Sequence, residues 1–174
     1  MADTSIDLKS SLDFDFLEDV DEDAKTLEGN AYKKAIYTFQ KTGLSSLADD
    51  TGLEVDSLDG RPGVYAARYA GENATYKDNV NKLLKELDGV ANRNAKFRTS
   101  ICFVSDEGTF FFEGICEGTI TLMQSGTGGF GYDPVFKPNG YSRTFAELNA
   151  EEKNTISHRG LATKKFVTFL KSID

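Results

Sequence analysis

The chain has 174 residues, 39% of them hydrophobic, and is therefore long enough to bury one substantial core. Its formal net charge of −8 would repel a nucleic-acid backbone or an anionic membrane surface, although a small anion can still bind locally. No apolar run approaches the roughly 18 residues of a membrane span, and segment 1–9 is too polar for a secretory signal. We therefore expect one cytoplasmic domain over residues 1–174, without a nucleic-acid or membrane partner.

The first two predicted elements lie in the N-terminal quarter. Residues 5–20 alternate weakly between apolar and acidic side chains, which predicts a half-buried strand. Thr26 is placed to cap a helix that ends before Gly43. Residues 44–48 then form a short apolar run, which predicts a strand that delivers the acidic residues 49–52 into a turn.

The remaining elements follow from caps and hairpin signals. Thr75, with Asp78 three residues later, predicts a helix that stops at Gly89. Segments 95–104 and 109–120 predict an antiparallel hairpin, and the phenylalanine run 110–112 implies burial on both faces. Ser157 is expected to cap a last helix. Together these elements predict an α/β fold with a mixed, twisted sheet flanked by helices.

The two cysteines indicate no disulfide framework. In the predicted hairpin Cys102 faces roughly Phe112, which leaves Cys116 out of bridging range. A metal site built from them would need further cysteines or histidines, and the chain has a single histidine, His158. We expect both cysteines to be core thiols.

Adjacent carboxylates mark the first candidate site. Asp49 and Asp50 repel each other at the end of a buried strand unless a cation lies between them and a ligand. Mg²⁺ suits such a position, and one carboxylate could instead accept a proton from an attacking water. An exposed acidic turn explains the same residues without any function.

Glycines mark the second candidate site, segment 125–134. Gly126, Gly128 and Gly131 match G-x-G-x-x-G, but a dinucleotide fingerprint must open a helix, and Asp133-Pro134 opposes one. What remains is a loop whose backbone can approach a ligand, with aromatic side chains available to stack on a base. A plain glycine-rich turn accounts for the segment equally well.

Three residues that can carry a positive charge mark the third candidate site, near the start of the last helix: Lys153, His158 and Arg159. Helix N-termini usually carry acidic residues, so cations there suggest an anionic or base-edge ligand. A lone histidine is more often structural than functional, so the cluster carries more weight than His158. Carboxylates, a base-binding loop and cations together are the components of nucleotide phosphoryl chemistry.

These segments resemble the signature blocks of the inosine/xanthosine triphosphate pyrophosphatase family. The blocks are residues 30–35, 48–53 with 60–69, 129–134, 151–154 and 157–159. Five ordered blocks make the resemblance specific, and it extends from about Glu22 to the C-terminus. It implies an elongated α/β fold with two lobes around a central cleft, a homodimer, and Mg²⁺-dependent hydrolysis of ITP, dITP and XTP to the monophosphate and pyrophosphate.

The resemblance also implies roles for particular residues. Asp50 would accept a proton or hold the metal, with Asp49 and Glu22 as acidic neighbours, and Lys34 would face the phosphates. The catalytic set is thus Asp50, Asp49 and Lys34, and the metal ligands are Asp50 and Glu22. The substrate-binding set comprises Thr51, Phe130, Gly131, Tyr132, Asp133, Lys153, His158 and Arg159. Cations beside the base favour the 6-oxo acceptor of hypoxanthine and xanthine over the amino donor of adenine.

The N-terminus departs from the family pattern. Relatives begin with an apolar strand and a phosphate-gripping loop, whereas this chain starts at what resembles the family's second strand. The loss of that unit would weaken the binding of the triphosphate. A catalytically weak nucleotide-binding or dimerising remnant of the fold is therefore the alternative to an active pyrophosphatase.

Overall fold

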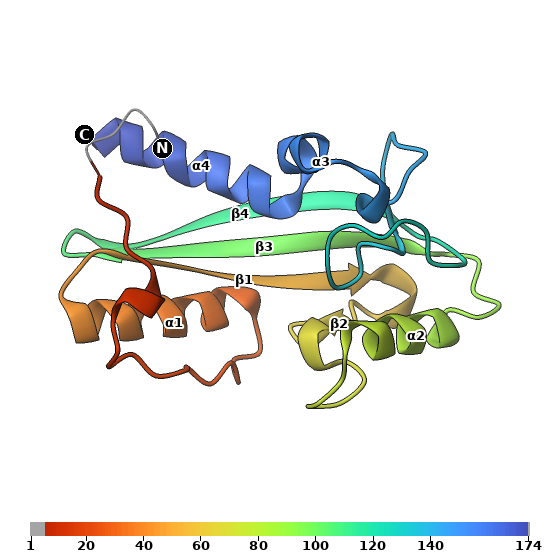
Figure 1. Ribbon diagram of the computed structural model, residues 1–174, viewed down its shortest axis with the longest axis horizontal. Helices are drawn as coiled ribbons and strands as arrows, with labels where there is room; N and C mark the ends of the chain where they lie inside the picture. Colours follow the sequence, from red (N-terminus) through yellow and green to blue (C-terminus); the bar gives the residue numbers. More distant parts are fainter. Residues whose placement is uncertain (1–5, 174) are drawn as a thin grey trace.

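A five-stranded sheet forms the centre of the computed structural model, which describes residues 6–173 (Figure 1). The strand order is β2-β1-β3-β4-β5. The strands are β1 Ser46–Val55, β2 Pro62–Gly63, β3 Asn94–Ser105, β4 Gly108–Ile120 and β5 Phe136–Pro138. The α-helices are α1 Leu27–Thr42, α2 Tyr76–Glu86, α3 Ala150–Ile156 and α4 His158–Ile173. Within residues 6–173, no helix is both long and apolar enough to span a bilayer.

Every strand pairing in the described chain is antiparallel, so the predicted mixed sheet is wrong. The strand β3 begins beside the end of β1, where Val55 lies opposite Ala95. The segment that contains α2 is therefore an excursion at one end of the sheet. For β1 and β3 to pair in parallel, the segment between them would have to cross back so that β3 began beside the start of β1. Flanking helices and the α/β class are as expected.

The predicted hairpin of β3 and β4 is confirmed. Its turn lies at residues 106–107, and Ser105 pairs with Gly108. Cys102 lies opposite Phe111, one residue from the expected partner, and Cys116 lies opposite Phe97. Both cysteines are buried free thiols, as expected.

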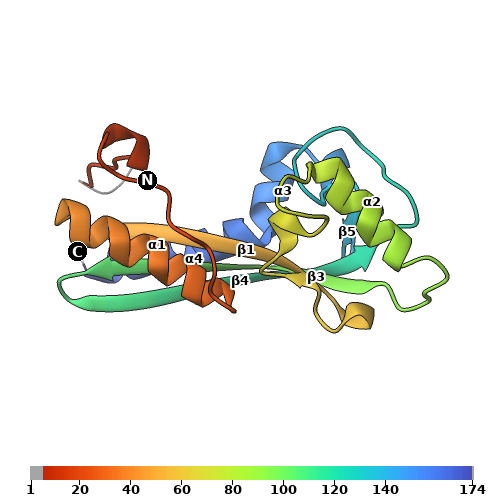
Figure 2. The ribbon, with the colours of Figure 1, turned by 90° about the horizontal axis from the view of Figure 1, so that it is seen from below.

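Helices α1 and α4 cover opposite faces of the long strands (Figure 2). Successive strand residues point to opposite faces, so Cys102 packs against α1 while Phe103 packs against α4. On the α4 side a cluster of phenylalanines fills the interface: Phe103, Phe110, Phe112, Phe166 and Phe169. The helix starts are set locally, because Thr26 caps α1 and a Thr75–Asp78 capping box opens α2, both as predicted.

A third and larger cluster lies at the other end of the sheet, where α2 packs. Val80 and Leu83 of α2 join Leu53 of β1, Phe97 of β3 and Phe136 of β5, all of which are buried. Burial of such side chains supplies the main driving force for docking this end of the molecule on the strands. The loops that carry the glycine-rich segment are therefore anchored to the same core as β1.

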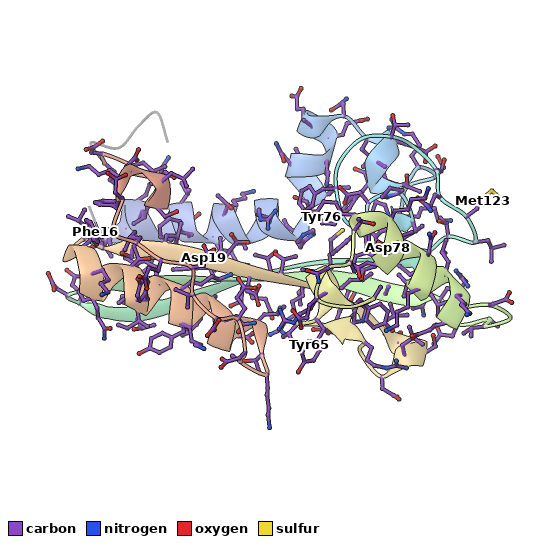
Figure 3. The ribbon with its side chains drawn as sticks, turned by 60° about the horizontal axis from the view of Figure 1, so that its bottom comes forward. Phe16, Asp19, Tyr65, Tyr76, Asp78 and Met123 are labelled. Atoms are coloured by element: carbon purple, nitrogen blue, oxygen red, sulfur yellow. The ribbon has the colours of Figure 1, made fainter. Side chains whose placement is uncertain are left out.

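The predicted strand at residues 5–20 is wrong over the part that the structure describes, and Ser5 lies outside that part. Residues 6–20 contain only a single 3₁₀ turn at Ser11–Asp13 and no strand (Figure 3). The apolar side chains that suggested alternation, such as Leu12 and Phe16, are exposed. A strand needs a partner for its backbone groups, and no described sheet edge pairs with this segment.

Two further expectations are corrected. The acidic residues 49–52 do not form a turn, because β1 continues through them to Val55. Phe111 is exposed, so the run 110–112 is not buried on both faces; the side chains alternate instead. Ser157 caps the last helix, α4, as predicted, because its hydroxyl accepts from the Gly160 amide; the short helix α3 directly before it was not predicted.

The close approach of α4 to β4 gives a stability prediction. A Cβ added at Gly114 would lie 1.9 Å from the His158 carbonyl oxygen and 2.5 Å from the Ala162 nitrogen, both backbone atoms. We expect Gly114→Ala to lower the free energy of unfolding by about 3 kcal/mol, at the upper end of the usual overpacking cost. Urea unfolding measures the change, with the exposed Thr109→Ala on the same strand as the control. Equal stability of the two variants would contradict this packing.

Candidate active site

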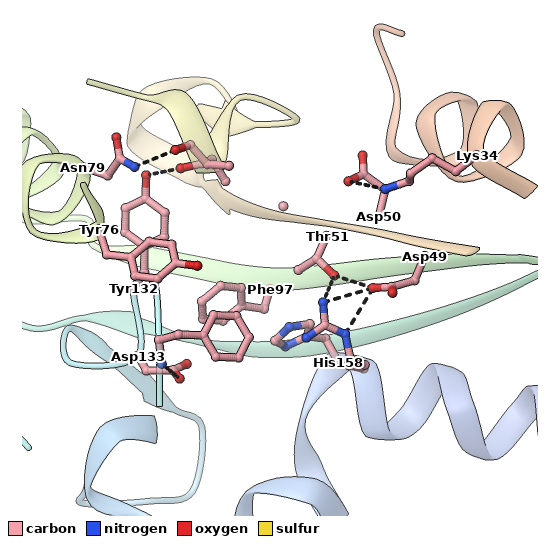
Figure 4. Close-up of a pocket in the computed structure, with 16 residues that line it drawn as sticks. Lys34, Asp49, Asp50, Thr51, Tyr76, Asn79, Phe97, Tyr132, Asp133 and His158 are labelled. Atoms are coloured by element: carbon pink, nitrogen blue, oxygen red, sulfur yellow. Dashed lines mark hydrogen bonds and ion pairs between the residues drawn. The ribbon is translucent and has the colours of Figure 1, made fainter. Parts of the chain in front are cut away.

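A cavity of about 250 Å³ lies beside β1 and receives side chains from segments far apart in sequence (Figure 4). Lys34 comes from α1, Asp49 to Gly52 from β1, and His158 and Arg159 from the start of α4. The remaining lining residues are Ala66, Ala67, Tyr76, Asn79, Phe97, Phe130, Gly131, Tyr132 and Asp133. All three sequence-derived candidate segments therefore contribute to one pocket.

The two adjacent aspartates point to opposite faces of the sheet because β1 runs straight through them. Asp50 faces α1, where it contacts Asn30 and Lys34. Asp49 faces α4, where it contacts Arg159. Their charges are thus divided between the two sides of the strand, and they do not form one shared carboxylate pair.

Asp50 belongs to a polar cluster with Lys34 and Glu22. The Lys34 Nζ lies 2.7 Å from a Glu22 carboxylate oxygen and 3.6 Å from Asp50 Oδ1. On the other side, the buried Asn30 amide donates to Asp50 Oδ2 at 3.0 Å. The same Asn30 side chain accepts from the Ala24 amide at 2.9 Å, which orders the segment that carries Glu22.

Burial raises the pKa of Asp50 above the ordinary aspartate value, and the nearby Glu22 charge adds to the rise. The hydrogen bond from Asn30 and the positive charge of Lys34 act in the opposite direction. A carboxylate with a raised pKa is a stronger proton acceptor, which suits a base that removes a proton from water.

On the α4 side, Arg159 bridges the first turn of the helix to β1. Its guanidinium donates to Asp49 Oδ2 at 3.0 and 3.1 Å and reaches Thr51 Oγ1 at 3.5 Å. Thr51 also shares a 2.6 Å hydrogen bond with Thr99 on β3. The pair of Asp49 and Arg159 is partly exposed, so a bound anion can compete for the guanidinium.

Aromatic side chains form the other end of the pocket. The His158 ring stacks on Phe97 with centroids 4.6 Å apart and an interplanar angle of 17°. The Tyr132 hydroxyl donates to the Ala66 carbonyl at 2.9 Å, which joins the glycine-rich loop to the opposite wall. Phe130 is half exposed, with the cations of Lys153 and Arg159 at 5.1 and 5.8 Å from its ring centroid.

Lys153 and Asp133 form a buried ion pair behind this aromatic end. The Asp133 carboxylate also accepts from the Phe130 amide at 2.8 Å and so fixes the loop. Lys153 does not line the cavity itself; it lies over the rings of Phe130 and Phe145. The structure thus brings together every site residue named from the sequence, with Glu22 and Lys153 directly behind the pocket wall.

The glycine-rich segment is a loop, and no helix follows it before the short strand β5. The formal G-x-G-x-x-G match is therefore not a dinucleotide fingerprint. Gly129 is required at its position for space, because an added Cβ would lie 2.0 Å from Asp133 Oδ2.

Sequence reasoning missed four residues of this site. Asn30 holds Asp50, and it lies within a quoted family block, although no role was assigned to it. Asn79 is buried and ties α2 to the Ala67 carbonyl and the Ala70 amide, with bonds of 2.8 and 2.7 Å. Phe97 and Tyr76 line the aromatic end. The last three fit ordinary core or surface patterns, so the sequence carried no signal for them.

The chain matches the model of the Ham1 family over residues 1–169. It is 51% identical over 166 residues to the dITP/XTP pyrophosphatase of Flavobacterium johnsoniae, covering 95% of this chain and 86% of that protein. It is 53% identical over 154 residues to the dITP/XTP pyrophosphatase of Porphyromonas gingivalis, covering 88% and 79%. Among solved structures, the Staphylococcus aureus Ham1 protein superposes with a TM-score of 0.87 at 39% identity, covering 90% of this chain and 82% of that one.

The titration of the single histidine, His158, tests whether the aromatic end of the pocket is buried as described. His158 is buried and its Nδ1 has no hydrogen-bond partner in the described residues. Burial, helped by the charges of Arg159 and Lys153, lowers its pKa to about 3. We therefore expect its imidazole resonances to stay constant between about pH 8 and 5, the range in which an ordinary histidine titrates. An NMR titration with a midpoint near the usual histidine pKa would contradict the burial; the urea-unfolded chain is the positive control.

Proposed function

The chain belongs to the Ham1 family, and we propose that it is a dITP/XTP pyrophosphatase. In this reaction water cleaves the bond between the α- and β-phosphates and leaves the nucleoside monophosphate and pyrophosphate. We propose that ITP is a substrate as well, because it carries the same hypoxanthine base. In this proposal, the pocket described above is the cleft between two lobes that the family resemblance implies.

The arrangement of charge along the pocket carries this proposal. One end holds Asp50 with Lys34, and the other is lined by Phe97, His158 and Phe130. A nucleoside triphosphate has the matching asymmetry, a polyanion at one end and a flat heterocycle at the other. The aromatic end therefore suits the base, and Lys34 suits the phosphates.

In the proposed reaction Asp50 accepts a proton from the attacking water, for which its raised pKa and fixed orientation suit it. Lys34 offsets the negative charge of the phosphates as the bond breaks. Asp49 acts by holding Arg159, since the strand directs its carboxylate away from Asp50.

The chemistry of the donor set also fits a magnesium ion. Asp50 and Glu22 already share a cation, because the Lys34 ammonium contacts both carboxylates. Within residues 6–173 no cluster of three or more acidic, histidine or cysteine ligands occurs. Mg²⁺ prefers few carboxylates together with waters and substrate phosphates, so these two residues would hold it when substrate is bound. Its chemical contribution would be to neutralise phosphate charge.

In the proposed complex, hydrogen-bond donors of the protein beside the purine base select the substrate. The 6-oxo groups of hypoxanthine and xanthine accept hydrogen bonds, whereas the adenine amino group would oppose a donor with another donor. Arg159 supplies such a donor beside Phe130, and Lys153, which does not line the cavity, acts by holding Phe130 and Asp133 in place. The adenine amino group offers the Arg159 donor no acceptor, so adenine gains no hydrogen bond that could replace its carboxylate partner, Asp49.

The test is pyrophosphate release by the purified chain with Mg²⁺ and ITP, dITP, XTP, ATP or GTP. We expect turnover of the first three and at least about a hundredfold lower kcat/KM for ATP, because its amino group meets a donor where the other bases present an acceptor. No release of pyrophosphate from any of the first three by a folded sample would refute the proposal.

Asp50→Asn tests whether Asp50 is the group that accepts the proton from water. The substitution preserves the volume of the side chain and removes the proton acceptor, so we expect kcat to fall by about a hundredfold or more. The free energy of unfolding should fall by less than in Gly114→Ala. Near-normal turnover would show that another group activates the water.

We also propose that the protein is a homodimer. Along β4 only Gly118–Ile120 pairs with β5, so in the described chain residues 108–117 leave one strand edge without a strand partner. Phe111 and Ile115 on this strand are exposed, and an open edge with apolar side chains favours association. Light scattering should give twice the chain mass, and Ile115→Lys should shift it toward the monomer; a monomeric parent protein would contradict the proposal.

A further inference from the structure

Tyr76 stands apart from the other aromatic residues of the pocket because it is exposed and comes from α2. Phe97 and Tyr132 are buried in the floor, whereas 59% of the Tyr76 surface is accessible. Tyr76 lines the same cavity as Lys34 and Asp50, at the aromatic end. An accessible aromatic ring in a pocket wall offers a binding surface for a flat ligand.

The position of Tyr76 is fixed by its helix. It is the first residue of α2, directly after the Thr75 cap and its capping box with Asp78. Helical side chains lean toward the N-terminus, so the ring projects beyond the end of α2 into the pocket (Figures 3 and 4). One turn later, Asn79 locks α2 to the loop at Ala67 and Ala70. The ring is therefore held on a rigid element.

The neighbouring ring of Phe130 is already engaged by cations. Lys153 and Arg159 lie over it, whereas no described cation lies over Tyr76. The two ring centroids are 6.4 Å apart and the planes are inclined by 45°, so both rings cannot lie flat on the same base. Of the two exposed rings, that of Tyr76 is the one with no described cation over it.

We propose that the ring of Tyr76 stacks on the purine base of the bound nucleotide and thereby sets the affinity for the substrate. The inference rests on the proposed function for the identity of the ligand. The Tyr76 hydroxyl makes no hydrogen bond within the described residues, so the ring face is the recognising group and the hydroxyl is dispensable. Tyr76 contacts substrate in every step and contributes equally to the ground state and the transition state.

Kinetics of two variants separate the ring from the hydroxyl. Loss of one base–aromatic contact should raise KM by about tenfold in Tyr76→Ala with kcat unchanged, the signature of uniform binding. Tyr76→Phe retains the ring and should keep the KM of the parent protein. Because position 76 is exposed and Thr75 and Asp78 still cap the helix, both variants should fold.

A binding measurement does not depend on turnover. The chain has no tryptophan, so Tyr76→Trp introduces a single tryptophan at the proposed contact, which can be excited selectively over the tyrosines. We expect saturable quenching by inosine monophosphate and none by ribose 5-phosphate, which lacks the base. Tyr32→Trp, at an exposed position on α1 outside the pocket, is the matched control and should respond to neither.

The outcomes separate this inference from the proposed function. Suppose that the parent protein is active, that the fluorescence of Tyr76→Trp does not respond to inosine monophosphate, and that Tyr76→Ala has an unchanged KM. These results would overturn the role of Tyr76 and leave the proposed function intact. Base-dependent quenching in a protein that releases no pyrophosphate would support the base contact and refute the enzymatic function. If calorimetry detects no binding of inosine monophosphate by the parent protein, the inference fails.

Discussion

The alternation of side chains along β1 is the constraint on which the pocket depends. Because successive residues of a strand point to opposite faces, Asp50 reaches Lys34 on the α1 side while Asp49 reaches Arg159 on the α4 side. One strand therefore serves two chemically different halves of the site. A turn at these residues would have placed both carboxylates in one environment and forced their pKa values apart. The continuous strand avoids that repulsion and connects the α1 side, which we propose binds the phosphates, to the α4 side, which we propose binds the base.

The cations of the pocket already have partners before substrate arrives. Lys34 is paired with Glu22, and Arg159 with Asp49, and each pair is partly exposed. Exposed ion pairs contribute only about 0–1 kcal/mol, so a phosphate or a base oxygen can replace a carboxylate at small cost. The pair of Lys153 and Asp133 differs because it is buried, and its loss would leave an unpaired charge in the interior. The first two pairs are thus suited to rearrange on binding, and the third to hold the loop in place.

Local signals predicted much of this fold and missed what depends on distant contacts. The caps at Thr26 and Thr75 and the hairpin of β3 and β4 were found because each is determined within a few residues. The antiparallel pairing of β1 with β3 was missed because it depends on where the chain returns after α2. The weak alternation at residues 6–20 was read as a strand, although a strand also requires a partner edge, which no local pattern specifies. The candidate segments were found from their residues and their roles were assigned through the family resemblance, whereas Tyr76 and Asn79 emerged only from their place around the cavity.

The contacts between blocks explain why those blocks are separate in sequence and still form one site. Asn30 of the first block holds Asp50 of the second, and Tyr132 of the loop bonds to Ala66 in the opposite wall. Asp133 pairs with Lys153, and Arg159 returns to Asp49. Each block therefore orients a residue of another, so that no block can adopt its working geometry alone. Gly114 belongs to no block, yet it lets the start of α4 approach β4 closely enough to bring His158 and Arg159 to the pocket. Packing of this kind is as much a condition for the proposed base recognition as the polar side chains to which that recognition is assigned.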